Sequence, residues 1–281
     1  MDVTNLTGKT ALVTGGASGI GKATALALAR RGASLILCDV NDAGLAETAA
    51  QIRAMGREVF AQRVDVANRD DMRSFAEAVH TRVEAVDLLM NNAGVALGAG
   101  MLDTSLEDWD WIVSINLWGV IHGCHYFVPQ MVKRGRGGHV INLSSTAGYV
   151  AAEGLLAYAT TKFAVLGLSE ALRDELSRHG IGVTAVCPGV INTPITLSAR
   201  MRGFQATPLV RDGMIAAFRR RNYAPERVAD NILKAVQRNR GVAPISPEAW
   251  FGYVVKRLAP WAISWMNRTL SDRVRRQVGT A

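Results

Sequence analysis

Short apolar runs rich in β-branched residues alternate with amphipathic stretches along most of the chain. The apolar runs predict strands at residues 9–14, 34–38, 58–64, 86–90, 138–144 and 181–187. The amphipathic stretches predict helices at residues 22–31, 45–55, 69–84, 153–179 and, as one very long helix, 106–134. Strands joined by helices form a parallel sheet through right-handed crossovers. We therefore expect an α/β fold with a doubly wound parallel sheet of about seven strands, helices on both faces and a C-terminal helical extension.

No internal repeat or low-complexity linker interrupts this alternation. Residues 1–246 are therefore expected to form one domain and residues 247–281 an extension. The 49% hydrophobic and 20% charged residues are typical of a folded protein. The three cysteines are widely spaced and lack a CxxC pair, which favours reduced thiols and a cytoplasmic location. Neither a signal peptide nor a membrane-spanning helix is expected.

A glycine-rich turn, Gly15-Gly-Ala-Ser18-Gly19-Ile20-Gly21, lies between the first predicted strand and the first predicted helix. Glycines allow the backbone to approach a pyrophosphate closely, and the N–H groups and dipole of a helix N-terminus favour negative charge. The turn is therefore a predicted phosphate cradle. Its Gly-x-x-x-Gly-x-Gly spacing departs from the usual Gly-x-Gly-x-x-Gly fingerprint of dinucleotide sites.

Asp39 ends the second predicted strand. An acid at this place binds the hydroxyls of the adenosine ribose and repels a 2′-phosphate. The next residues are Val40 and Asn41, so no arginine is at hand to bind such a phosphate. NAD is therefore the expected cofactor, with NADP less favoured. The alternative interpretation of Asp39 is a helix N-cap or turn residue.

Other candidate segments follow the remaining predicted strands directly. Asp65-Val66 follows the third strand, Asn91–Gly94 (Asn-Asn-Ala-Gly) the fourth, Ser145 the fifth and Pro188-Gly189 the sixth. The carboxyl ends of parallel strands share one edge of the sheet, and doubly wound folds bind their ligands there. The sequence thus predicts one dinucleotide site at this edge.

Tyr158 and Lys162 lie four residues apart in a predicted helix, and Ser145 lies thirteen residues before the tyrosine. On a helix the two side chains share a face, one turn apart. An ammonium group beside a phenol favours the phenolate, so we expect the pKa of Tyr158 to fall from about 10 toward the working pH range. Such a phenol exchanges a proton with an alcohol oxygen. The alternative is an ordinary amphipathic helix whose lysine reaches to solvent.

Together these motifs, in this order and spacing, resemble the short-chain dehydrogenase/reductase family of NAD(P)-binding Rossmann-fold oxidoreductases. The resemblance covers roughly residues 6–242 and rests on Thr14-Gly-x-x-x-Gly-Ile-Gly21, Asn91–Gly94, Ser145, Tyr158-x-x-x-Lys162 and Pro188-Gly189. It implies hydride transfer between the nicotinamide C4 and the carbon of a small-molecule secondary alcohol or ketone.

The resemblance also implies a role for each matching residue. Tyr158 is expected to be the general acid/base, and Lys162 to bind the nicotinamide ribose and tune the tyrosine. Ser145 is expected to stabilise the substrate oxygen, with Ser144 as the competing serine, and Asn116 to hold a water that relays protons. The implied catalytic residues are Asn116, Ser145, Tyr158 and Lys162. The implied cofactor-binding residues are Gly15, Ser18, Gly19, Ile20, Asp39, Asp65, Val66, Asn92, Ala93, Gly94, Tyr158, Lys162, Pro188, Gly189 and Thr193.

Residues 194–222 correspond to the mobile substrate lid of the resembling family. Their apolar side chains favour a hydrophobic alcohol or ketone, although plain helix packing is the alternative. Two other functions are open. A 3-oxoacyl reductase using NADPH fits Asp39 poorly, and a non-catalytic dinucleotide-sensing protein would not need the complete set of Ser145, Tyr158 and Lys162.

The extension is basic and contains three of the six tryptophans. It has six basic and two acidic residues, so it contributes a surplus of four to the net charge of +8. An apolar stripe runs along a predicted helix that Pro260 ends; its members are Trp250, Phe251, Val254, Val255 and Leu258. Such a segment is compatible with peripheral contact to an anionic membrane. We favour packing on this chain or on a neighbouring copy, because apolar stripes usually face a core.

The remaining signals are weaker. The pI near 9.8 raises nucleic acid as a partner, but no recognised binding module supports it, and the run Arg219–Arg221 is interpreted as solvated. His122, Cys124 and His125 resemble metal ligands, but neighbours on a helix diverge, so no metal site is expected. The resemblance implies a homodimer or homotetramer formed through the long helices.

Overall fold

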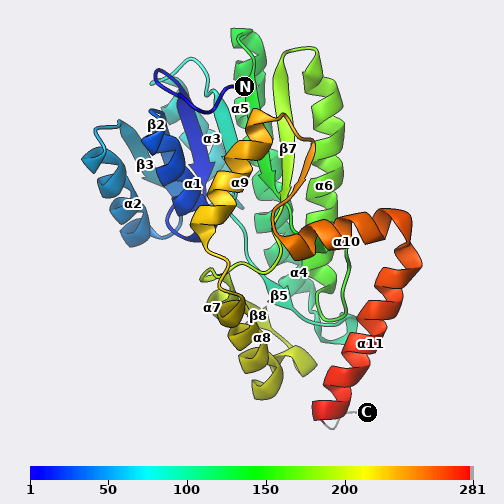
Figure 1. Cartoon of the computed structure of the whole chain (residues 1–281). Helices are drawn as coiled ribbons and strands as arrows, with labels where there is room; N and C mark the ends of the chain where they lie inside the picture. Colours follow the sequence, from blue (N-terminus) through cyan, green and yellow to red (C-terminus); the bar gives the residue numbers. More distant parts are fainter. Residues whose placement is uncertain (279–281) are drawn as a thin grey trace.

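The computed structural model describes residues 1–278. Seven strands form one sheet in the order β3-β2-β1-β4-β6-β7-β9, and every neighbouring pair is parallel. The expected doubly wound α/β fold is therefore confirmed (Figure 1). The strands are β1 (Thr10–Thr14), β2 (Ser34–Asp39), β3 (Val59–Arg63), β4 (Leu88–Asn91), β6 (Gly138–Leu143), β7 (Ile181–Cys187) and β9 (Val242–Pro244).

Helices cover both faces of this sheet (Figure 1). One face carries α1 (Gly19–Arg30), α2 (Asp42–Ala54) and α9 (Pro225–Gln237); the other carries α3 (Arg69–His80), α5 (Gly119–Arg134) and α6 (Leu156–Ser177). Successive strand residues point to opposite faces. Val13 therefore belongs to the first core and its neighbour Leu12 to the second. This explains why the strands are continuous apolar runs rather than alternating ones.

The expected long helix at residues 106–134 is not one regular α-helix. It consists of α4 (Leu106–Val113), a π-helical turn at Ser114–Trp118 and α5. The prediction of an uninterrupted α-helix was wrong because the turn directs Asn116 inward, where its amide bonds both backbone polar groups of Val95. Such turns recur at functional sites.

The lid has more structure than the sequence predicted. It comprises α7 (Ile195–Ser198), the short strand β8 (Arg200–Met201), a 3₁₀ turn at Gly203–Ala206 and α8 (Pro208–Arg221). Strand β8 pairs in parallel with β5 (Leu97–Gly98) to form a second, two-stranded sheet. This small sheet ties the lid to the segment that follows β4.

The extension forms two helices, α10 (Pro247–Leu258) and α11 (Pro260–Val278), so the predicted break at Pro260 is confirmed. The apolar stripe does not face the core of this chain: Phe251, Val254 and Leu258 are exposed. The small residues Ala249 and Gly252 occupy the inner face of α10, and packing of the stripe on a neighbouring copy stays a prediction. Residues 279–281 and the side chains of Leu270, Arg273, Val274, Arg275, Gln277 and Val278 lie outside the described part.

Across residues 1–278, no helix combines the length and the apolar character that crossing a bilayer requires.

Candidate active site

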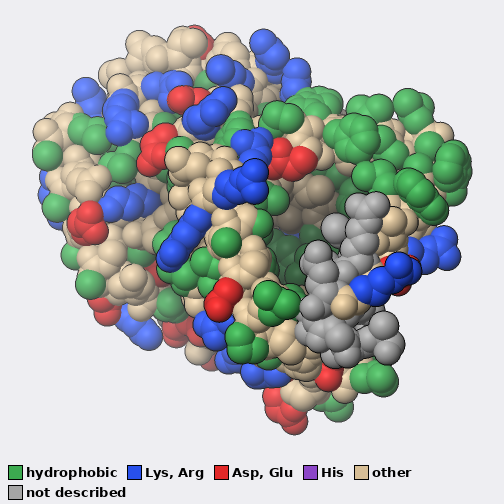
Figure 2. Space-filling model, turned by 60° about the horizontal axis from the view of Figure 1, so that its bottom comes forward, with side chains coloured by type: hydrophobic (Ala, Val, Ile, Leu, Met, Phe, Trp, Pro, Cys, Tyr) green, Lys and Arg blue, Asp and Glu red, His purple; other side chains and the backbone are tan. Residues whose placement is uncertain are grey.

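A cavity of about 670 Å³ lies at the carboxyl ends of the central strands and beneath the lid. Figure 2 shows the molecule hollowed on this side. Every residue that the sequence assigned to the site lines this cavity except Asn116. The cavity therefore brings together segments that are far apart in the chain, from the glycine turn to the loop after β7.

The glycine turn presents the N-terminus of α1 to the cavity. Gly15 has φ 67° and Gly19 has φ 53°, conformations that favour glycine. A Cβ at Gly15 would lie 2.7 Å from Nδ2 of Asn92, so the turn also needs glycine for space. Asn92 Nδ2 donates to the carbonyl oxygens of Thr14 (2.9 Å) and Gly15 (3.1 Å). The amide of Asn92 therefore holds the turn in shape, and the helix dipole favours an anion in front of it.

Asp39 hydrogen-bonds the backbone of the glycine turn and also lines the cavity. Its Oδ2 accepts from the backbone N–H of Ala17 (3.0 Å) and its Oδ1 from that of Asn41 (2.9 Å). The N-cap of α2 is Asn41, whose side chain accepts from Gly44. Asp39 is thus not the cap, but its carboxylate is positioned by two backbone donors at the end of β2.

His122 and Cys124 have structural partners. His122 Nδ1 lies 2.9 Å from the carbonyl oxygen of Val66, which positions the Asp65-Val66 segment at the cavity. Cys124 Sγ contacts the amides of Asn91 and Asn142 in the interior. Within the part of the chain that the structure describes, no group of three or more His, Cys, Asp or Glu residues is arranged to hold a metal ion.

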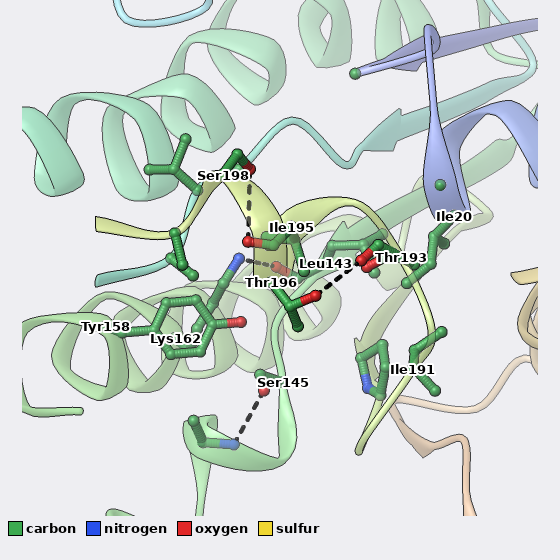
Figure 3. A pocket seen from close by; sticks show the side chains of 18 of the residues that line it. Ile20, Leu143, Ser145, Tyr158, Lys162, Ile191, Thr193, Ile195, Thr196 and Ser198 are labelled. Atoms are coloured by element: carbon green, nitrogen blue, oxygen red, sulfur yellow. Dashed lines mark hydrogen bonds between the residues drawn. The ribbon is translucent and has the colours of Figure 1, made fainter. Parts of the chain in front are cut away.

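Ser145, Tyr158 and Lys162 converge on the cavity. The Tyr158 hydroxyl points between Lys162 and Ser145 (Figure 3). The Lys162 ammonium lies 5.8 Å from the centroid of the Tyr158 ring and donates a 2.8 Å hydrogen bond to the carbonyl oxygen of Leu143. Ser145 Oγ accepts from the N–H of Ala147 (3.1 Å). The alternative serine, Ser144, has a buried hydroxyl that donates its hydrogen bond to the carbonyl oxygen of Lys162 (2.8 Å).

The expected lowering of the tyrosine pKa was wrong for this structure. Burial raises the pKa of Tyr158 above its ordinary value, and a side-chain hydrogen bond with Ser145 only partly opposes this. The Lys162 ammonium donates its hydrogen bond to the carbonyl oxygen of Leu143. Burial likewise lowers the pKa of Lys162 from 10.5 to about 8. Both groups are therefore shifted toward their neutral forms by the dry interior.

Asn116 lies behind the cavity rather than on its wall. It is fully buried, its Oδ1 accepts from Val95 N (2.8 Å), and its Nδ2 donates to Val95 O (2.9 Å) and Thr161 Oγ1 (3.3 Å). Both amide protons are thus bound by protein atoms. A Cβ on Gly94 would lie 3.2 Å from Asn116 Oδ1 and 3.6 Å from Lys162 Nζ, so the two side chains stand side by side behind Gly94. The water relay stays a prediction.

The loop after β7 closes the far side of the cavity. Thr193 lies opposite the glycine turn, and a Cβ on Gly19 would be 3.5 Å from the Cβ of Thr193. The carbonyl oxygen of Pro188 accepts from both N–H (2.9 Å) and Oγ1 (3.0 Å) of Thr146, which ties the loop to the turn after Ser145.

The sequence analysis missed two polar groups near the cavity. Buried Asp108 on α4 accepts from Arg202 Nε (3.0 Å) and Nη2 (3.1 Å), and Arg200 lies 3.5 Å from the same carboxylate. This ion pair holds β8 onto α4. Glu248 lines the cavity and joins the N–H of Val190 (3.2 Å) to Arg221 of the lid (3.0 Å). Neither group belongs to a local motif, so no sequence signal pointed to them.

The substrate side of the cavity is apolar. Residues from three regions contribute to it, namely the segment after β4, the turns before α6, and the lid. They include Val95, Leu97, Val150, Leu155, Met201, Met214 and Phe218. An apolar wall favours ligands with a hydrophobic body.

The fold and the site together define a class of protein. A doubly wound sheet with a glycine turn at its ligand edge, beside a tyrosine, a lysine and a serine in one cavity, is typical of a dinucleotide-dependent oxidoreductase. A family model described as short chain dehydrogenase matches residues 9–202. The chain belongs to the short-chain dehydrogenase/reductase family of NAD(P)-binding Rossmann-fold oxidoreductases.

Individual relatives agree with this assignment. The chain is 40% identical over 258 residues to the probable oxidoreductase EphD of Mycobacterium bovis, covering 89% of this chain but 43% of that protein. It thus spans less than half the length of that relative. It is 35% identical over 232 residues to the 3-oxoacyl-[acyl-carrier-protein] reductase FabG of Thermotoga maritima, covering 81% and 90% of the two chains. A solved short-chain dehydrogenase/reductase from Burkholderia phymatum, in complex with NAD, matches with a TM-score of 0.79 at 29% identity, covering 95% of this chain and 97% of that one.

Proposed function

We propose that this protein transfers a hydride between NAD(H) and a hydrophobic secondary alcohol or ketone. The observation that carries the proposal is the placement of Tyr158 and Ser145 in the same cavity as the glycine turn. The residues fit a dinucleotide, because the N-terminus of α1 faces the cavity, where its dipole favours an anion, and Asp39 is positioned to accept from ribose hydroxyls. When bound, NAD(H) supplies or accepts the hydride at its nicotinamide ring.

The side chains of this chain have separate tasks in the proposed reaction. Tyr158 donates a proton to the carbonyl oxygen during reduction and removes it from the hydroxyl during oxidation. Ser145 hydrogen-bonds the same oxygen and stabilises the charge that develops there. Lys162, charged below its pKa of about 8, binds the nicotinamide ribose. The apolar wall excludes water from the reacting carbon.

NAD is proposed over NADP on the strength of Asp39. Its carboxylate lies at the end of β2, and Val40 and Asn41 follow it without a cation. A 2′-phosphate at this place would meet the like charge of the Asp39 carboxylate. The NAD-bound Burkholderia protein supports this choice by similarity.

A second candidate is reduction of 3-oxoacyl thioesters with NADPH, which the similarity to FabG favours. The negative charge of Asp39 argues against it, and a non-catalytic dinucleotide sensor is opposed by the complete set of Ser145, Tyr158 and Lys162. One experiment separates the three. Purified protein is screened against alcohols, ketones and 3-oxoacyl thioesters with NAD⁺, NADH and NADPH, following the absorbance of the reduced nicotinamide.

Tyr158→Phe is the matched control for that screen. It removes one hydroxyl and keeps the ring, so binding of NADH is expected to persist while turnover falls by about 10²–10⁴-fold. Retention of wild-type turnover within tenfold would refute the role of Tyr158. Tight NADH binding with no turnover on any substrate would favour the sensor, and a preference for thioesters with NADPH would favour the second candidate.

A further inference from the structure

Large apolar side chains gather on the outer surface where α10 meets α11. Phe251 is 57% exposed, Leu258 80%, Trp261 73% and Trp265 62%. Together with Val254 these residues form what we call the tail corner. Figure 2 shows a field of hydrophobic side chains at this end of the molecule, beside the hollow. Isolated apolar residues on a surface are ordinary, but a contiguous patch with two tryptophans marks a contact site.

The tail corner is held outward by contacts on the opposite side of the same helices. The Tyr149 hydroxyl donates to the carbonyl oxygen of Ala249 (2.7 Å), and Asn267 Nδ2 donates to that of Ala151 (2.6 Å). Ile263 of α11 is buried. Because both helices are anchored through these groups, turning the corner inward would break these contacts.

The charge around the corner is positive. Arg257, Arg268 and Arg276 are exposed on α10 and α11. Of the two acidic residues in this region, Glu248 is engaged by Arg221 at the cavity, which leaves Asp272 on the surface. Exposed tryptophans flanked by arginines combine a ring that suits the lipid–water interface with a charge that attracts anionic headgroups.

We propose that the tail corner docks this protein onto the surface of an anionic phospholipid bilayer. The apolar side chains enter the interface, and the arginines contact lipid headgroups. A second copy of the chain is a poorer occupant. A two-fold contact would place the same patch of each copy against the other, bringing two tails with a surplus of four positive charges each into proximity.

The tail corner lies close to the cavity, which connects membrane docking with access of a substrate to the site. Val150 and Glu248 line the cavity, and a Cβ on Gly252 of α10 would lie 3.3 Å from the Val150 side chain. Helix α10 of the tail therefore packs directly against residues that line the cavity. If the proposed function holds, docking presents the apolar substrate side to molecules dissolved in the bilayer, but the docking itself does not depend on catalysis.

The test is co-sedimentation of the full chain with vesicles, which has no activity readout. One set of vesicles is phosphatidylcholine alone and the other is phosphatidylcholine mixed with phosphatidylglycerol. We expect binding to the mixed vesicles that weakens when salt rises from about 0.1 M to about 1 M, because the screening length falls from about 10 Å to about 3 Å. Trp261→Ser with Trp265→Ser is expected to reduce binding at least tenfold.

A charge-matched pair of variants isolates the electrostatic part. Arg257→Glu with Arg268→Glu should abolish the preference for anionic vesicles. Arg53→Glu with Lys133→Glu makes the same change in net charge at exposed positions on α2 and α5 and should leave binding within twofold. Thermal unfolding of each variant verifies that it is folded.

Three results would overturn the proposal. The first is no binding to anionic vesicles at low salt. The second is binding that the tail variants and the remote variants weaken equally. The third is a wild type that does not bind vesicles, together with a Trp261→Ser, Trp265→Ser variant that forms a smaller oligomer than the wild type in sedimentation velocity. That result would assign the tail corner to contacts between copies of the chain.

Discussion

The ammonium group of Lys162 donates its hydrogen bond to the carbonyl oxygen of Leu143, the last residue of β6, at 2.8 Å. A cation on the second turn of α6 is thereby fixed to the end of a central strand, beside Ser145 and within 5.8 Å of the Tyr158 ring centroid. Burial lowers its pKa to about 8 from 10.5. The buried surroundings of Lys162 therefore disfavour its charged form.

Lys162→Met should remove turnover and stabilise the protein. The folded-state pKa of about 8 lies below the unfolded value of about 10.4, so at neutral pH the buried charge destabilises the fold by about 3 kcal/mol. The lost hydrogen bond offsets about 1 kcal/mol of the gain. We expect a thermal midpoint several degrees higher, measured without cofactor at pH 7. Because the penalty shrinks as pH rises from about 8 to about 10, the wild type should approach the variant over that range. A variant with a lower midpoint at pH 7 contradicts this account.

The two reaction directions should depend on pH with opposite slopes. Burial raises the pKa of Tyr158, so the phenol keeps its proton at neutral pH and is poised to donate it. Reduction should therefore be fast at neutral pH and decline above about pH 8, where Lys162 loses its charge. Oxidation should rise with pH in the neutral range because the phenolate fraction increases. Profiles of kcat/KM in both directions test this, and pH-independent oxidation between about pH 6 and 7 would show that the tyrosine pKa lies lower.

Ser145→Ala and Ser144→Ala form a matched pair of neighbouring changes. The Ser145 hydroxyl faces the cavity, so its removal should lower kcat about 10²–10³-fold with little change in thermal stability. The Ser144 hydroxyl is buried on the Lys162 carbonyl oxygen, so its removal should lower stability by about 1 kcal/mol and leave kcat within tenfold. Steady-state kinetics and thermal melts distinguish them. The reverse pattern would assign the catalytic role to Ser144.

Asp39→Asn should shift the cofactor preference toward NADP(H). The change removes the charge that repels a 2′-phosphate and keeps an acceptor for only one of the backbone N–H groups of Ala17 and Asn41. We expect the ratio of kcat/KM for NADH to that for NADPH to fall at least about tenfold, a change of about 1.4 kcal/mol. A wild type that already prefers NADPH would overturn the assignment.

Asp108→Asn should loosen the lid without affecting the cofactor site. Its buried carboxylate holds Arg202, the residue after β8, and loss of that charge leaves the lid strand with its backbone pairing and the contact of Arg200 with the Trp111 ring. We expect KM for the substrate to rise several-fold, the Kd for NADH to stay constant, and stability to fall by about 1–3 kcal/mol. The exposed neighbour Asp110→Asn is the control and should match the wild type. Equal effects of the two variants would exclude the lid contact as the cause.

Local signals in the sequence were sufficient for most of the fold. The strand runs, the glycine turn and the break at Pro260 all depend on residues close together in the chain, so periodicity and backbone chemistry reveal them. The gathering of the site residues was also predictable, because parallel strands present their carboxyl ends at one edge. The family resemblance, rather than any local pattern, pointed to Asn116.

Contacts between distant segments were not predictable in this way. The π-helical turn depends on Asn116 meeting Val95, and the lid sheet on Arg202 meeting Asp108 ninety-four positions earlier. The sign of the Tyr158 pKa shift depends on how deeply the phenol is buried and on where the Lys162 ammonium points. Spacing along a helix states which side chains share a face, but not which acceptor a flexible lysine selects.

The sequence by itself determined the order of strands and helices, the residue types at the ligand edge and the class of chemistry they allow. Only the tertiary structure decided the protonation tendencies of those residues, the anchoring of the lid and the outward direction of the tail corner. The physical reason is that periodicity and turn chemistry are properties of neighbouring residues, whereas desolvation, ion pairing and exposure depend on what the whole fold places around each group.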